Sequence, residues 1–230
     1  MKTSEILAGF FVMTVWVLAA GSTQAGVIQM PPDPVVSGPG LGSATATIDN
    51  TDPAAPILSV NKSFDAVGAI EMIFDVVARD DSNTHTFNEV IANGTGVDWS
   101  EFQLELFYEL TAGGIVGNAG DRFRGDSVAV NGVSLVFTSV TAAPEFTGII
   151  GLNTSEVLLQ TGPGVPAGGN FDPTFTITVP NPVASAFEFD LVLVQTPIAS
   201  TAVPEPASLA LMGLGLAGIG YRRHRNKIAV

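Results

Sequence analysis

The 230-residue chain contains no cysteine. Disulfide bonds, cysteine-ligated zinc or iron–sulfur centres and a thiol nucleophile are therefore excluded. Histidine is nearly as scarce: of the two in the chain, His224 lies close to the C-terminus and His85 is alone in the middle. Without a second imidazole or a Gly-x-Ser-x-Gly motif, most hydrolase and zinc arrangements fail. We expect His85 to lie on the surface, at the edge of a strand.

Positive charge is the next shortage. The chain has 9 Lys and Arg against 22 Asp and Glu, a formal net charge of −13. Most basic residues lie near the two ends, so the middle of the chain keeps only four of them: Lys62, Arg79, Arg122 and Arg124. A body this acidic is repelled by phosphate backbones, which argues against nucleic acid as a partner. Divalent cations, cationic surfaces and neutral sugars remain candidate partners.

The N-terminus has the layout of a secretory signal peptide. Lys2 precedes an apolar run from Ile6 to Ala20, and small residues follow, with Thr23-Gln24-Ala25 as the cleavage triplet. We therefore expect residues 1–25 to be removed by cleavage after Ala25, and the rest of the protein to be exported.

The C-terminus carries a second apolar run, between Pro204-Glu205-Pro206 and a group of basic residues. The uncharged residues 207–221 would reach about 22 Å as a helix, and flanking residues with snorkelling arginines can extend this toward a ~30 Å hydrocarbon core. We expect a single transmembrane helix with the body outside the cytoplasm. The stop-transfer cluster that would stay inside consists of Arg222, Arg223, Arg225 and Lys227.

Taken together, the tripeptide, the glycine-rich apolar run and the arginine cluster resemble the PEP-CTERM sorting signal of Gram-negative bacteria that make exopolysaccharide. The resemblance covers about the last 27 residues. It implies recognition by an exosortase, a membrane-embedded cysteine transpeptidase, and processing near Pro204, Glu205 and Pro206. On this interpretation the tail, residues 199–230, is a transient inner-membrane anchor, and the body goes to the cell surface or extracellular matrix. The alternative is an ordinary C-terminal anchor.

Between the ends, the pattern is that of strands. Residues 26–56 are rich in Pro and Gly and predict an extended lead-in with one strand at Ala44–Asp49. Residues 57–198 alternate apolar and polar side chains with a period of two, as in Glu101–Leu110, where a helix would instead stack like charges four residues apart. The fold class predicted is all-β, an antiparallel β-sandwich of nine or ten strands, with jelly-roll and Ig-like topologies both open. Expected strands are Ile57–Val60, Glu71–Val77, Thr86–Ile91, Glu101–Leu110, Val133–Thr138, Phe146–Ile150, Glu156–Leu159, Thr174–Val179 and Phe187–Val194.

One stretch of the body carries a second, softer resemblance. Asn93, Thr95, Gly96 and Trp99 are similar to an N-x-T-G-x-x-W turn common in the ectodomains of PEP-CTERM proteins. The resemblance implies a structural role, in which Asn93-Gly94 turns the chain and Trp99 starts the next strand.

Calcium is the one cofactor that the residues suggest, since hard cations take oxygen ligands. The candidate ligands are Asp80, Asp81, Asn83 and Asp121, in two polar loops. Neither loop matches a known calcium motif, and polar turns that hydrogen-bond their own backbone explain them better. We regard Arg124-Gly125-Asp126, the tripeptide of some adhesion ligands, as accidental.

We expect a non-catalytic structural component of the biofilm, associated with exopolysaccharide and sorted by exosortase. The first alternative is a carbohydrate-binding module at the cell surface, which would need exposed aromatic side chains: Trp99, Phe107 and Tyr108 are the candidates. The second is a surface glycoside hydrolase, which would need two facing carboxylates. Its candidates are Glu101, Glu105 and Glu109.

Overall fold

The computed structural model describes residues 25–28, 33–49, 51–52, 56–79, 84–111, 118–129, 133–180 and 188–200. The expected signal peptide up to residue 24, the apolar and basic parts of the tail, and Asp80, Asp81 and Asn83 lie outside these ranges. Every regular element within them is a β-strand. No helix in the described part of the chain is long and apolar enough to cross a membrane.

The larger sheet has eight strands, all antiparallel to their neighbours, in the order β1-β5-β14-β7-β11-β10. Short β2 also pairs with β5, and short β8 with β7. The strands are β1 (Ala25–Ile28), β2 (Val35–Ser37), β5 (Ile70–Arg79), β7 (Trp99–Leu110), β8 (Arg122–Arg124), β10 (Gly148–Ile150), β11 (Glu156–Gln160) and β14 (Phe189–Ala199).

The smaller sheet has six strands in the order β3-β4-β6-β13-β9, with β12 also paired to β6. One pair, β4 and β6, is parallel, so the prediction of a wholly antiparallel fold is wrong at this point. The reason is that β5, which separates them in the chain, lies in the other sheet, so the chain crosses over and returns in its original direction. The strands are β3 (Leu41–Asp49), β4 (Ile57–Phe64), β6 (Thr84–Asn93), β9 (Val136–Thr141), β12 (Asn170–Phe171) and β13 (Thr174–Thr178).

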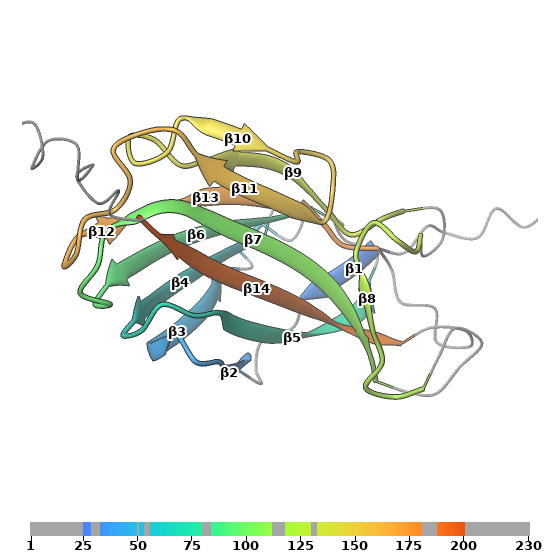
Figure 1. Cartoon of the computed structure of the whole chain (residues 1–230). Coiled ribbons are helices and arrows are strands. Elements are labelled where there is room, and N and C mark those ends of the chain that lie inside the picture. The colour runs from blue at the N-terminus through green and yellow to red at the C-terminus, as the bar shows by residue number, and fades with distance from the viewer. Residues whose placement is uncertain are drawn as a thin grey trace, which may run out of the picture.

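The two sheets pack face to face over one hydrophobic core (Figure 1). Alternate residues of each long strand point inward and are buried, as the period-two pattern predicts. Aromatic rings join the layers: Phe64 of β4 meets Trp99 of β7 edge to face with centroids 5.3 Å apart, and Phe74 of β5 meets Phe87 of β6 at 5.7 Å. Such pairs add about 0.5–1.5 kcal/mol each beyond the area they bury.

Most expected strands are present, including short β10 within the expected Phe146–Ile150, but four other short strands were not predicted. Strands β1, β2, β8 and β12 have two to four residues, too few to display an alternation. The lead-in at residues 26–56 contributes most of β1 together with β2 and β3, and β3 contains the expected Ala44–Asp49. Strand β9 begins at Val136, three residues later than expected.

Candidate functional site

The turn after β6 is a closely hydrogen-bonded corner that carries the chain from one sheet to the other. The side chain of Asn93 is buried, and its amide nitrogen Nδ2 donates to three backbone carbonyls: those of Val97 at 2.9 Å, Val165 at 3.2 Å and Pro166 at 3.0 Å. Its Oδ1 accepts from the backbone N–H and the hydroxyl of Thr95, at 3.1 and 2.7 Å. Asn93 therefore binds both its own turn and the loop before β12.

Trp99 closes this corner from the other side. Its indole Nε1 donates to Thr95 Oγ1 at 3.1 Å, while its backbone exchanges hydrogen bonds with Val165 at 2.9 and 3.0 Å. Gly96, with φ of 77°, has the left-handed backbone that favours glycine. The four residues that carry the N-x-T-G-x-x-W resemblance thus all act within one structural corner.

The aromatic residues that a carbohydrate-binding surface would need are mostly in the core. Trp99 is 1% exposed and Tyr108 is 0% exposed, and Phe107 is half-buried. The hydroxyl of Tyr108 accepts the backbone N–H of Leu135 at 3.0 Å, and burial raises its pKa. These positions leave the carbohydrate-binding alternative without two of its three expected contacts.

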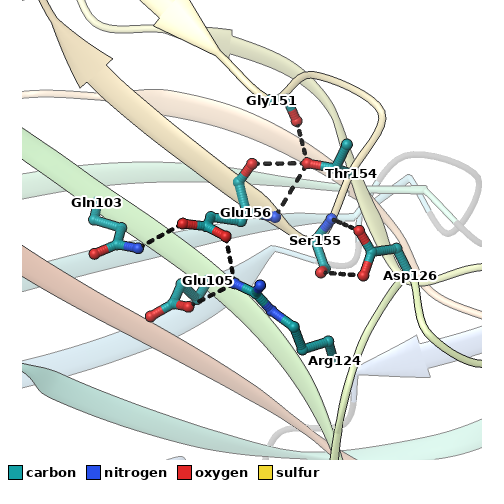
Figure 2. A network of polar contacts seen from close by, with 8 residues as sticks. All are labelled: Gln103, Glu105, Arg124, Asp126, Gly151, Thr154, Ser155 and Glu156. Atoms are coloured by element: carbon teal, nitrogen blue, oxygen red, sulfur yellow. Dashed lines mark hydrogen bonds and ion pairs between the residues drawn. The ribbon is translucent and has the colours of Figure 1, made fainter.

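The outer face of the larger sheet holds a network of charged side chains around two arginines of β8. Arg124 lies between Glu105 and Glu156 and donates Nη2 to both, at 2.9 Å in the case of Glu105 (Figure 2). Glu156 also accepts from Gln103 Nε2 at 2.8 Å. Hydrogen bonding to Glu156 is the largest cause that raises the pKa of Arg124.

Arg122 makes the second half of this network. Its Nε donates to Glu109 at 2.6 Å, and its two terminal nitrogens, Nη1 and Nη2, donate to the two carboxylate oxygens of Glu71 at 2.6 and 2.7 Å. The bidentate bond with Glu71 is the largest contribution to the raised pKa of Arg122. Glu105 and Glu109, two of the proposed hydrolase carboxylates, are therefore each held by an arginine, an arrangement that favours a structural role for both.

The Arg124-Gly125-Asp126 tripeptide is also used within the fold. A Cβ on buried Gly125 would lie 2.3 Å from the carbonyl oxygen of Leu135. Asp126 accepts from the hydroxyl of Ser155 at 2.7 Å and from its backbone N–H at 3.3 Å, and Figure 2 shows this pair beside the arginine network. Hydrogen bonding to Ser155 lowers the pKa of Asp126. Within the fold, Asp126 and Gly125 therefore have structural contacts of their own.

Three carboxylates occupy one row across neighbouring strands. Asp190 of β14 pairs in register with Asp75 of β5 on one side and with Glu109 of β7 on the other. Burial, and then the charges of Asp75 and Glu109, raise the pKa of Asp190 to about 6. Among the residues that the structure describes, no group of His, Asp and Glu side chains is placed to hold a metal ion.

Of the four candidate calcium ligands, only Asp121 belongs to the described residues. It is exposed, and its Oδ2 accepts the backbone N–H of Asn118 at 2.8 Å, while its own N–H donates to the carbonyl of Asn118 at 3.0 Å. This is the geometry of a polar turn that satisfies its own backbone.

The position predicted for His85 is wrong. Its side chain lies on the same face of β6 as Phe87, points into the core and is fully buried. Nε2 accepts the backbone N–H of Ile28, at 3.2 Å, so the imidazole links β1 of the larger sheet to β6 of the smaller one. Two threonines flank His85 in the sequence, but they face the opposite side of the strand.

Sequence reasoning missed a buried polar cluster, which we call the core triad: Lys62, Glu89 and Gln195. Glu89 Oε1 lies 2.8 Å from Lys62 Nζ, and Glu89 Oε2 accepts from Gln195 Nε2 at 2.8 Å. The side chains of Lys62 and Glu89 are 0% exposed, and Gln195 is 0% exposed as a residue. A signal was available in the sequence, because each of the three residues stands at one of the alternate strand positions that otherwise hold inward-facing apolar side chains.

The comparisons with known proteins bear on the tail. Residues 202–225 match the family model of the PEP-CTERM protein-sorting motif. A search of curated proteins and a search of solved structures each returned no match. The chain therefore carries a PEP-CTERM sorting motif, and this motif implies processing by an exosortase after export.

Proposed function

We propose that this chain is a non-catalytic structural protein of the cell surface or extracellular matrix, with a β-sandwich body delivered by its sorting tail. The observation that carries the proposal is the match of residues 202–225 to the PEP-CTERM motif, with Pro204, Glu205 and Pro206 inside it. The tail would anchor the body transiently in the inner membrane until the exosortase acts near the tripeptide.

The character of the body supports a structural role. Several polar groups considered for function are engaged in holding the fold: arginines bind Glu105 and Glu109, and Ser155 binds Asp126. The acidic surface adds a colloidal argument, since net charge far from zero keeps an exported protein soluble and separate at high local concentration. Association with exopolysaccharide belongs to this proposal and rests on the sorting motif alone.

The experiment compares cells with and without their exosortase. The protein is tagged inside the body and followed by fractionation and mass spectrometry of its termini. We expect a form that begins at Gly26, ends near the Pro-Glu-Pro tripeptide and reaches the matrix fraction only when exosortase is present. The variant Glu205→Ala should stay in the inner membrane, whereas the matched control Glu188→Ala should be sorted normally.

Retention of the full tail in both strains would contradict sorting by exosortase. Normal sorting followed by complete release into the medium, with no difference between cells that make exopolysaccharide and cells that do not, would contradict the matrix role. The two failures are distinguishable, because the first leaves an uncleaved tail and the second a cleaved one.

A further inference from the structure

The core triad brings an amine, a carboxylate and a carboxamide together inside the hydrophobic core. Lys62 comes from β4 and Glu89 from β6, both in the smaller sheet, and Gln195 comes from β14 in the larger sheet. Each oxygen of the Glu89 carboxylate contacts one nitrogen. Oε1 lies 2.8 Å from Lys62 Nζ, and Oε2 lies 2.8 Å from Gln195 Nε2. The Glu89 carboxylate therefore bridges the Lys62 amine and the Gln195 carboxamide, which come from different sheets.

This arrangement is unfavourable as a purely structural device. Taking a lysine and a glutamate out of water costs free energy that their attraction often only balances, and apolar residues of similar volume would fill the same space. Burial lowers the pKa of the Lys62 ammonium, although the charge of Glu89 opposes this effect. The carbonyl oxygen of Gln195, Oε1, is buried and has no hydrogen-bond partner among the described residues. An amide with one satisfied end and one unsatisfied end is a costly core residue.

The same features suit a reaction. A lysine amine becomes a nucleophile when a hydrophobic pocket favours its neutral form. Glu89 is placed to accept a proton from Lys62 Nζ and to deliver it to the Gln195 side chain, which it also contacts. The surrounding core excludes water, which would otherwise compete for the carbonyl carbon.

We propose that Lys62 and Gln195 become joined by an intramolecular isopeptide bond, with Glu89 as the proton-transfer group. Glu89 takes one proton from the ammonium, and the lone pair of Nζ attacks Cδ of Gln195. The Nζ–Cδ bond forms, and Nζ still carries two protons, of which the new amide keeps one. Glu89 delivers its proton to Nε2 and takes the second proton from Nζ, and the Cδ–Nε2 bond breaks to release ammonia. Ammonia then takes this proton from Glu89 and leaves as ammonium, which restores the Glu89 carboxylate. No oxidant, cofactor or second enzyme is needed.

Mass spectrometry of the folded protein tests the bond directly. The loss of ammonia lowers the mass by about 17 Da. Trypsin supplies the location, because an acylated Lys62 is no longer a cleavage site. We expect one branched peptide in which the segment that contains Lys62 and ends at Arg79 is joined to the segment that follows Arg124 and contains Gln195. A cyclised Asn-Gly sequence would also lose about 17 Da, but it would leave Lys62 cleavable.

Variants assign the roles. Glu89→Gln keeps the size of the side chain but removes the proton acceptor, so its mass should equal that of its sequence. Gln195→Met removes the carboxamide at similar volume and should also show no mass loss. The matched control Glu101→Gln, which makes the same change on the outer face of β7, should retain the loss of about 17 Da in full.

The wild-type protein decides the outcome, so a variant that fails to fold does not leave the matter open. Folded wild-type protein with the full mass of its sequence and normal cleavage after Lys62 would overturn the proposal. A branched peptide that forms equally in Glu89→Gln would overturn the role of Glu89.

Discussion

Replacing Asn93 by alanine should destabilise the protein more than any other polar truncation in the described turns. The substitution removes a side chain that donates to three carbonyls and accepts from Thr95 twice. All three carbonyls keep another donor: Val165 still accepts from the backbone of Trp99, and Val97 from the hydroxyl of Thr95. The carbonyl of Pro166 still accepts the N–H of Gly169 at 2.9 Å.

The magnitude follows from this count. Each net hydrogen bond contributes about 0.5–1.5 kcal/mol, and a buried group left under-satisfied costs more than one exposed to water. Since no carbonyl is stripped of every partner, we expect a loss of about 3 kcal/mol from the free energy of unfolding, rather than the full sum over five bonds. For a body of this size, that corresponds to a fall in Tm of roughly 6–12 °C.

The assay is urea unfolding followed by far-UV circular dichroism and by the emission of Trp99, which reports the corner itself. Asn88→Ala is the matched control: the same substitution on the same strand, at an exposed position whose side chain accepts from the hydroxyl of Thr174. Its cost should stay below about 0.5 kcal/mol. Equal costs for the two variants, or a cost below about 1 kcal/mol for Asn93→Ala, would refute the assignment of the corner as a stabilising element.

Two further predictions concern strain and pH. Gly164 and Gly96 both have positive φ, but a Cβ on Gly164 would lie 2.0 Å from the carbonyl oxygen of Trp99, whereas one on Gly96 meets nothing within 4 Å. Gly96→Ala should therefore cost about 1 kcal/mol of left-handed strain and Gly164→Ala clearly more, and similar unfolding midpoints for the two variants would argue against this explanation. Asp190 has a folded pKa of about 6, above its ordinary value of 3.8, so the folded state binds its proton more tightly and the protein loses stability as pH rises from about 4 to 6. After allowance for partial exposure, this loss of stability is on the order of 1 kcal/mol. Urea titrations at pH 4 and pH 7 should show the loss in the wild-type protein and not in Asp190→Asn. If the variant keeps the same pH dependence, the loss belongs to other groups.

The long strands could be predicted because their alternation is local. Phe102, Leu104 and Leu106 face the core in β7 as their spacing predicts, and Asn93 turns the chain where the resemblance placed a turn. The parallel pairing of β4 with β6 could not be predicted in this way, because it depends on the sheet that β5 joins. No property of Ile57–Phe64 itself carries that information.

The core triad and His85 were missed for a related reason. Lys62 lies between inward-facing Val60 and Phe64, so the alternation in the sequence already indicated that its side chain faces the core. A charged residue at such a position is acceptable only with a partner, and the partners lie 27 and 133 residues away along the chain, in β6 and β14. Their meeting requires the register of both sheets and the way in which one sheet faces the other, neither of which an alternation pattern contains.

The position of β14 has a mechanical consequence. It is the last strand before the sorting tail, and it runs antiparallel between two partners, β5 and β7, with β7 paired along its whole length. If the tail is anchored as proposed, drag on the body would reach the sheet at Ala199, and β14 would bear that load in shear, with its ladder hydrogen bonds resisting together rather than opening one at a time. The sorting tail thus follows a central strand of the larger sheet, one that is hydrogen-bonded on both sides.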